Sequence, residues 1–112
     1  MNIAMQEETK KIITICPEGR LDSFAAPQLR AKLVALVEGG YHNVLLDLRQ
    51  IEFIDSACIA VLISTLKLTQ RLGGDTKLVI PNDAAIREMI QLSNFDKIFT
   101  IVETPELAFE LF

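Results

Sequence analysis

The chain has 112 residues, of which 50% are hydrophobic and 23% are charged, and its formal net charge is −4. This length is typical of one domain, and the hydrophobic content is too high for an intrinsically disordered chain. The acidic balance argues against a surface for nucleic acid or for anionic membranes, because both need clustered Lys and Arg. We therefore expect residues 1–112 to form a single folded domain that binds neither.

The cysteines and the apolar runs indicate the compartment. Cys16 and Cys58 lie far apart and in no metal-binding spacing, whereas a short secreted domain usually carries more cysteines. Residues 2–11 are mostly polar, unlike a signal peptide. The longest apolar run, residues 57–66, is too short and too interrupted to span a membrane. These features favour a cytoplasmic protein without a membrane-inserted segment.

The first part of the chain alternates between β-type runs and a helical pattern. Residues 3–6 and 12–16 are predicted to be paired strands joined by a polar turn at residues 7–10. A helix is predicted to open near Pro27, because proline suits the first helical turn, and to end at the Gly-Gly pair that follows. Its apolar residues recur at helical spacing: Leu29, Leu33, Leu36 and Val37.

The alternation continues after the first helix. Residues 44–48 are predicted to be a compact buried strand, followed by a loop and by a second helix from about Ser56 to Leu72. The remaining predicted elements are a strand at residues 77–80, a helix capped by Asn82 with Ile86, Met89 and Ile90 on one side, a strand at residues 98–102, and a short helix that starts at residues 104–106.

Strands and helices in alternation, with short links, predict crossover connections and an α/β sandwich. We expect a small mixed sheet of four to five strands with about four helices. The strands at residues 44–48 and 77–80 flank a helix and are therefore expected to be parallel neighbours.

Asp55 and Ser56 lie where the chain leaves a buried strand, passes through the loop and enters the second helix. Regulatory and ligand sites in open α/β sheets lie beyond the carboxyl ends of strands, which favours a site here. A serine at a helix start also has a purely structural interpretation, because it can cap the free backbone N–H groups of the first turn. Spacing alone leaves both interpretations open.

The start of the second helix is apolar nearly all round, from Ala57 to Ile63. A surface helix in so small a domain should show one polar face. Either this helix is covered on two sides, or its first turns expose an apolar patch suited to a partner.

A series of short motifs resembles the STAS domain of bacterial anti-sigma factor antagonists. The central motif is Asp47-Leu48, then Phe53-Ile54-Asp55-Ser56, then Val61-Leu62. The other motifs occur in the order that the family has them: Gly19-Arg20-Leu21-Asp22, Ala26-Pro27-Gln28-Leu29, Lys77-Leu78-Val79, Phe99-Thr100-Ile101 and Leu107-Ala108. The resemblance covers nearly the whole chain, and it implies a STAS-type sandwich.

The resemblance also implies a partner switch centred on Ser56. In that family the Ser after the Asp is phosphorylated by the cognate anti-sigma factor, a serine kinase, and a metal-dependent phosphatase reverses the modification. The unphosphorylated form binds the kinase and frees a sigma factor. Ser56 is therefore the expected phosphoacceptor and Asp55 its orienting acid. Family members commonly continue with Ser and Gly, where this chain has Ala57 and Cys58; losing the glycine bears on how closely a partner can approach.

Further candidates for the partner surface are Asp22, Ser23, Cys58 and Ile59. The resemblance places the loop with Asp22 and Ser23 near the phosphoacceptor, although helix-start chemistry explains these two residues equally well. Cys58 is either a redox-sensing thiol, since a helix N-terminus lowers thiol pKa, or a small packing residue.

The sequence does not favour an enzyme. His42 is the only histidine and lies in a turn, and no Gly-x-Ser-x-Gly motif surrounds Ser56. Gly73-Gly74 is followed by Asp75 without the lysine of a phosphate-binding loop. We expect neither a cofactor nor a metal.

Two alternatives to the partner switch remain. The first is a STAS subunit that docks on the ATPase of an ABC transporter without being phosphorylated. The second is a small enzyme whose turnover would depend on Ser56 or Cys58.

Overall fold

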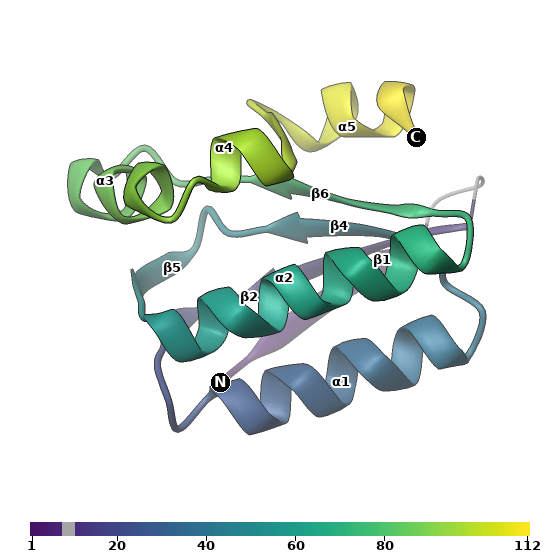
Figure 1. The fold of residues 1–112 in the computed structure, drawn as a ribbon, viewed down its shortest axis with the longest axis horizontal. Coiled ribbons are helices and arrows are strands. Elements are labelled where there is room, and N and C mark those ends of the chain that lie inside the picture. Colours follow the sequence, from purple (N-terminus) through teal and green to yellow (C-terminus); the bar gives the residue numbers. More distant parts are fainter. Residues whose placement is uncertain (8–10) are drawn as a thin grey trace.

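A five-stranded mixed sheet forms the centre of the computed structural model, which describes residues 1–7 and 11–112 (Figure 1). In order across the sheet, the strands are β1 (Ile3–Glu7), β2 (Ile12–Pro17), β4 (Asn43–Asp47), β6 (Asp75–Val79) and β7 (Thr100–Val102). β1 is antiparallel to β2, and all other neighbours are parallel. The predicted pairing of the first two strands and the parallel pairing of β4 with β6 are confirmed. The turn predicted between β1 and β2 lies largely outside the described residues.

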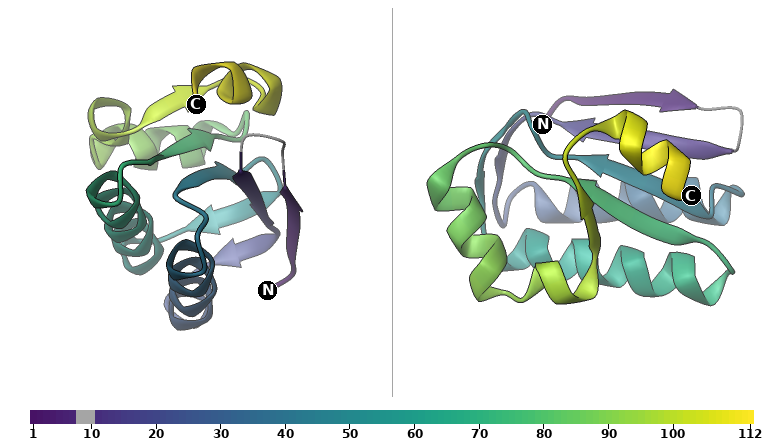
Figure 2. Two further views of the ribbon diagram at one scale, coloured as in Figure 1. Left: turned by 90° about the vertical axis from the view of Figure 1, so that its right-hand side faces the viewer. Right: turned by 90° about the horizontal axis from the view of Figure 1, so that it is seen from above.

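Helices cover both faces of the sheet (Figures 1 and 2). Helices α1 (Ala26–Glu38) and α2 (Ser56–Arg71) lie on one face, where α3 (Ala84–Leu92) and α4 (Phe95–Ile98) contribute to the same apolar core. Helix α5 (Pro105–Leu111) packs on the other face. Because side chains alternate along a strand, Val44 and Leu46 enter the larger core while Leu45 enters the smaller one. The predicted α/β sandwich is thus confirmed, with five helices in the described part of the chain where about four were expected.

A second, two-stranded sheet was not predicted from the sequence. β3 (Gly19–Leu21) and β5 (Ile51–Ile54) pair in parallel, with an irregular register after Gly19. The prediction that a loop joins the strand at residues 44–48 to the second helix is therefore wrong for residues 51–54. Ile51 and Ile54 are buried in the larger core, so this short strand is held by packing as well as by pairing.

Some predicted boundaries also differ from the structure. Ile98 ends helix α4, and the last strand begins only at Thr100. Asp83, not Asn82, caps α3, because its carboxylate accepts a hydrogen bond from the backbone N–H of Ile86 at 3.0 Å. The predicted start of the closing helix is confirmed, with Thr104 as the cap of α5.

The apolar start of α2 is explained by burial on two sides. Its buried residues face the sheet and α1, which packs directly against it. The exposed side of the helix carries small or polar residues: Ser56, Ala60, Ser64 and Lys67. Of the two interpretations that the sequence left open, the covered helix is the one observed. Among the described residues, no helix has the length and apolar character that a membrane crossing requires.

Candidate functional site at the start of helix α2

The two-stranded sheet brings together two segments that are distant in the sequence. Leu21 at the end of β3 pairs with Ile54 at the end of β5. The next residue, Asp55, donates its backbone N–H to the carbonyl oxygen of Leu21 at 3.1 Å. The loop of residues 22–25, here called the Asp22 loop, therefore lies beside the first turn of α2, as the resemblance implied.

Asp55 caps helix α2, and this leaves Ser56 free of that task. The backbone of Asp55 is extended, and its carboxylate accepts hydrogen bonds from the N–H groups of Ala57 at 3.0 Å and Cys58 at 3.3 Å. Ser56 is the first residue of the helix and is exposed. The structural interpretation of the serine as the helix cap is therefore wrong, since the neighbouring aspartate performs that function.

The capping role of Asp55 predicts a measurable loss of stability. Asp55→Ala is expected to lower the free energy of unfolding by about 1 kcal/mol, because two N–H groups of the first turn lose their acceptor. Asp55→Asn should keep most of the stability that the cap provides. Urea unfolding of the three proteins measures the difference. Asp83→Ala is the comparison variant, since the carboxylate of Asp83 also caps a helix but accepts only one N–H group. An unchanged unfolding midpoint for Asp55→Ala would contradict the assigned cap.

Cys58 faces the interior of the protein. Its side chain has no exposed surface, and its thiol donates a hydrogen bond to the carbonyl oxygen of Asp22 at 3.3 Å. Burial, together with the nearby carboxylates of Asp55 and Asp22, raises the pKa of the Cys58 thiol to about 11. The thiol is therefore protonated at neutral pH, which argues against a redox-sensing role and for packing.

The expectation that Cys58 and Ile59 contact a partner does not fit this burial. Ile59 is only 8% exposed and belongs to the larger core. By the resemblance noted above, Cys58 stands where glycine is common, but its side chain points inward and takes up no room on the outer surface. Neither side chain is available to a partner in this structure.

The Asp22 loop is fixed by its own aspartate. One carboxylate oxygen of Asp22 accepts hydrogen bonds from the N–H groups of Phe24 and Ala25, both at 3.1 Å. The carbonyl oxygen of Asp22 accepts the N–H groups of Ala25 and Ala26 at 3.0 Å. Asp22 thus performs helix-start chemistry, whereas Ser23 is simply exposed. Sequence reasoning missed Phe24, which this loop holds out into solvent with 92% of its surface exposed.

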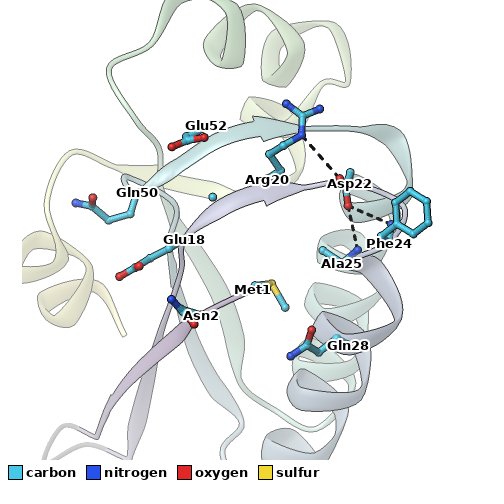
Figure 3. A pocket seen from close by; sticks show the side chains of 11 residues that line it. Met1, Asn2, Glu18, Arg20, Asp22, Phe24, Ala25, Gln28, Gln50 and Glu52 are labelled. Carbon is cyan, nitrogen blue, oxygen red and sulfur yellow. Dashed lines mark hydrogen bonds and ion pairs between the residues drawn. The ribbon is translucent and has the colours of Figure 1, made fainter.

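An open hollow of about 680 Å³ lies beside the Asp22 loop (Figure 3). We call it the acidic hollow; its polar lining includes Glu18, Arg20, Asp22, Gln28, Gln50 and Glu52. Within it, Arg20 lies 3.8 Å from the Asp22 carboxylate, and its guanidinium is 4.1 Å from the centre of the Phe53 ring. The only guanidinium in the lining is therefore already engaged by an anion and an aromatic ring.

The arrangement does not resemble a hydrolytic centre. His42 immediately precedes β4, whereas Ser56 follows the carboxyl end of that strand by way of β5. A strand of this length spans about 16 Å, far more than a hydrogen bond between serine and its base allows. Within residues 1–7 and 11–112, no group of three or more His, Cys, Asp or Glu side chains could hold a metal ion.

Residues 4–108 match the family model of the STAS domain. The chain belongs to the STAS domain family. The matched region includes every helix and strand that builds the candidate site, from β3 to α2.

Named relatives of this STAS protein are anti-sigma factor antagonists. The anti-sigma-B factor antagonist of Bacillus subtilis is 32% identical over 88 residues, which cover 78% of this chain and 80% of the relative. The candidate antagonist BtrV of Bordetella bronchiseptica is 31% identical over 99 residues, which cover 87% of this chain and 83% of the relative. The crystal structure of a candidate antagonist from Thermotoga maritima has a TM-score of 0.88 at 27% identity, covering 96% of this chain and 92% of that one. The predicted family and its STAS-type sandwich are confirmed.

Proposed function

We propose that this protein is an anti-sigma factor antagonist controlled by phosphorylation of Ser56. In its unphosphorylated form it binds a cognate anti-sigma factor that is also a serine kinase, and a sigma factor is released. Phosphorylation of Ser56 by that kinase abolishes the binding, and a metal-dependent serine phosphatase restores it. The protein then acts in the cytoplasm as a single regulatory STAS domain rather than as an enzyme.

The observation that carries this proposal is the exposed position of Ser56 directly after the capping Asp55. A kinase needs an accessible hydroxyl, and Ser56 is not committed to capping. A phosphoserine carries about −1.5 to −2 charges at neutral pH and three acceptor oxygens. At the first position of a helix it meets the positive end of the helix dipole, so the fold tolerates the added charge.

The test is transfer of phosphate from ATP. The protein is incubated with ATP and, in turn, with each anti-sigma-type serine kinase of its own genome, and its intact mass is measured. One added phosphate is expected on wild type and none on Ser56→Ala. Ser64→Ala is the matched control, since Ser64 is exposed on the same helix, and it should accept phosphate as wild type does.

The opposite result has a defined meaning. If no kinase adds phosphate to wild type, while the protein stably binds the ATPase and permease of an ABC transporter, the switch is excluded. The chain would then be a docking subunit of that transporter.

A further inference from the structure

Phe24 is an aromatic side chain held out into water by a fixed loop. It is 92% exposed, more than any other large hydrophobic residue in the described ranges. A single exposed apolar residue is ordinary by itself, so what distinguishes Phe24 is how its backbone is held. Here the N–H groups of Phe24 and Ala25 are bonded to the Asp22 carboxylate, and the Cys58 thiol is bonded to the Asp22 carbonyl. The backbone that carries the ring is therefore held in place, which lowers the entropy cost of ordering this loop against a partner.

The acidic hollow next to Phe24 offers mostly acceptors (Figure 3). Its lining residues supply three carboxylates, those of Glu18, Asp22 and Glu52, against two cationic groups, the guanidinium of Arg20 and the N-terminal amino group of Met1. Arg20 is already engaged by Asp22 and Phe53. Charge complementarity therefore favours a lysine or arginine side chain as the group that enters the hollow.

This surface is continuous with the phosphoacceptor. Asp55 is bonded through its N–H to Leu21, and Cys58 is bonded through its thiol to Asp22. These two contacts fix the Asp22 loop to the first turn of α2, which begins with Ser56. A protein that brings its active site to Ser56 meets Phe24 and the acidic hollow on the same end of the molecule.

We propose that Phe24 and the acidic hollow form the docking surface for the kinase, with Phe24 entering an apolar pocket and a lysine or arginine of the kinase entering the hollow. This rests on the proposed function, because it takes the kinase as the occupant. The surface supplies affinity at a distance from the transferred phosphate. Buried aromatic side chains commonly carry most of the binding free energy of an interface.

The first test is the dissociation constant of the complex between the protein and each purified anti-sigma-type serine kinase of the same genome. Phe24→Ala is expected to weaken the kinase complex about thirtyfold, as loss of a central aromatic anchor does. Leu111→Ala is the control, because Leu111 is 59% exposed on α5, on the opposite face of the sheet; it should bind like wild type. An unchanged dissociation constant for Phe24→Ala would overturn the docking surface.

The second test addresses charge. Glu52→Lys is expected to raise the dissociation constant of the kinase complex about tenfold at low ionic strength. Added salt should reduce this difference between the variant and wild type. Glu52 is chosen over Asp22 because the Asp22 carboxylate also holds the loop. Glu110→Lys changes the same charge on exposed α5 and should have no effect. If both variants raise the dissociation constant equally, only the net charge of the protein matters, and the acidic hollow is not part of the docking surface.

The docking surface and the Ser56 switch fail in different ways. If wild type and Phe24→Ala bind and accept phosphate equally, the docking surface is wrong and the switch stands. If a kinase binds through Phe24 without adding phosphate, the switch is wrong and the docking surface stands. If no kinase binds wild type, both are excluded.

Discussion

Phosphorylation of Ser56 is expected to weaken binding to the anti-sigma factor about a hundredfold. A kinase must place the γ-phosphate of ATP against the Ser56 hydroxyl, next to the carboxylate that accepts the hydroxyl proton. After transfer, the phosphoserine faces that carboxylate and the remaining nucleotide phosphates. A like charge at about 5 Å, in an effective dielectric near 20, costs on the order of 3 kcal/mol, which is roughly a hundredfold in affinity.

Titration calorimetry of phosphorylated and unphosphorylated protein with the nucleotide-bound kinase measures this effect. Ser56→Glu should reproduce part of it, since it carries a single charge. Ser64→Glu places the same charge on the exposed side of α2 and should bind normally. A tight complex with the phosphorylated protein would exclude the switch.

Phe95→Ala is expected to lower the free energy of unfolding by about 3 to 5 kcal/mol. Phe95 has no exposed surface, and its ring lies 4.9 Å from that of Phe99, centre to centre, within the larger core. The substitution leaves a cavity between α3, α4 and the sheet. Because small domains have a total stability of about 5 to 15 kcal/mol, the loss is a large fraction of the whole. Urea unfolding measures it.

Phe24→Ala is the control for this substitution and for the docking test together. It removes the same ring from a side chain that is almost fully exposed, so stability should change by less than about 0.5 kcal/mol. A loss comparable to that of Phe95→Ala would mean that Phe24 is packed, and its role as a docking residue would have to be abandoned. A small loss for Phe95→Ala would contradict the packing of α4.

The main sheet could be predicted because each of its strands carries its own local signal. Residues 44–48 are apolar except for Asp47 and are buried on both faces, as in a strand between two layers. The pair of β3 and β5 could not be predicted, because each is only three or four residues long and each is stabilised by the other across thirty residues of chain. Pairing between distant short segments leaves no periodicity in the sequence. Helix α4 was missed because its four residues are too few to show a helical period.

The candidate site was only partly predictable, because a sequence does not show which way a side chain points. The sequence places Asp55 and Ser56 at the start of a helix, but it does not show which of the two residues caps that helix. Cys58 and Ile59 stand in an apolar run that has no evident polar face, so their burial depends on α1 and the sheet. Phe24 was not singled out from the sequence, because nothing in its local pattern shows that the loop closed by Asp22 leaves this side chain exposed.

The candidate site exists only in the folded protein, because the parallel pairing of β3 with β5 brings its two parts together. Residue 21 and residue 55 are separated in the sequence by α1 and β4 and meet only in the folded chain. A nascent or misfolded molecule carries the Ser56 hydroxyl, yet Asp22 and Phe24 are elsewhere. On the proposed docking, the anti-sigma factor ignores such molecules, and the sigma factor responds to the concentration of correctly folded antagonist rather than to the amount synthesised.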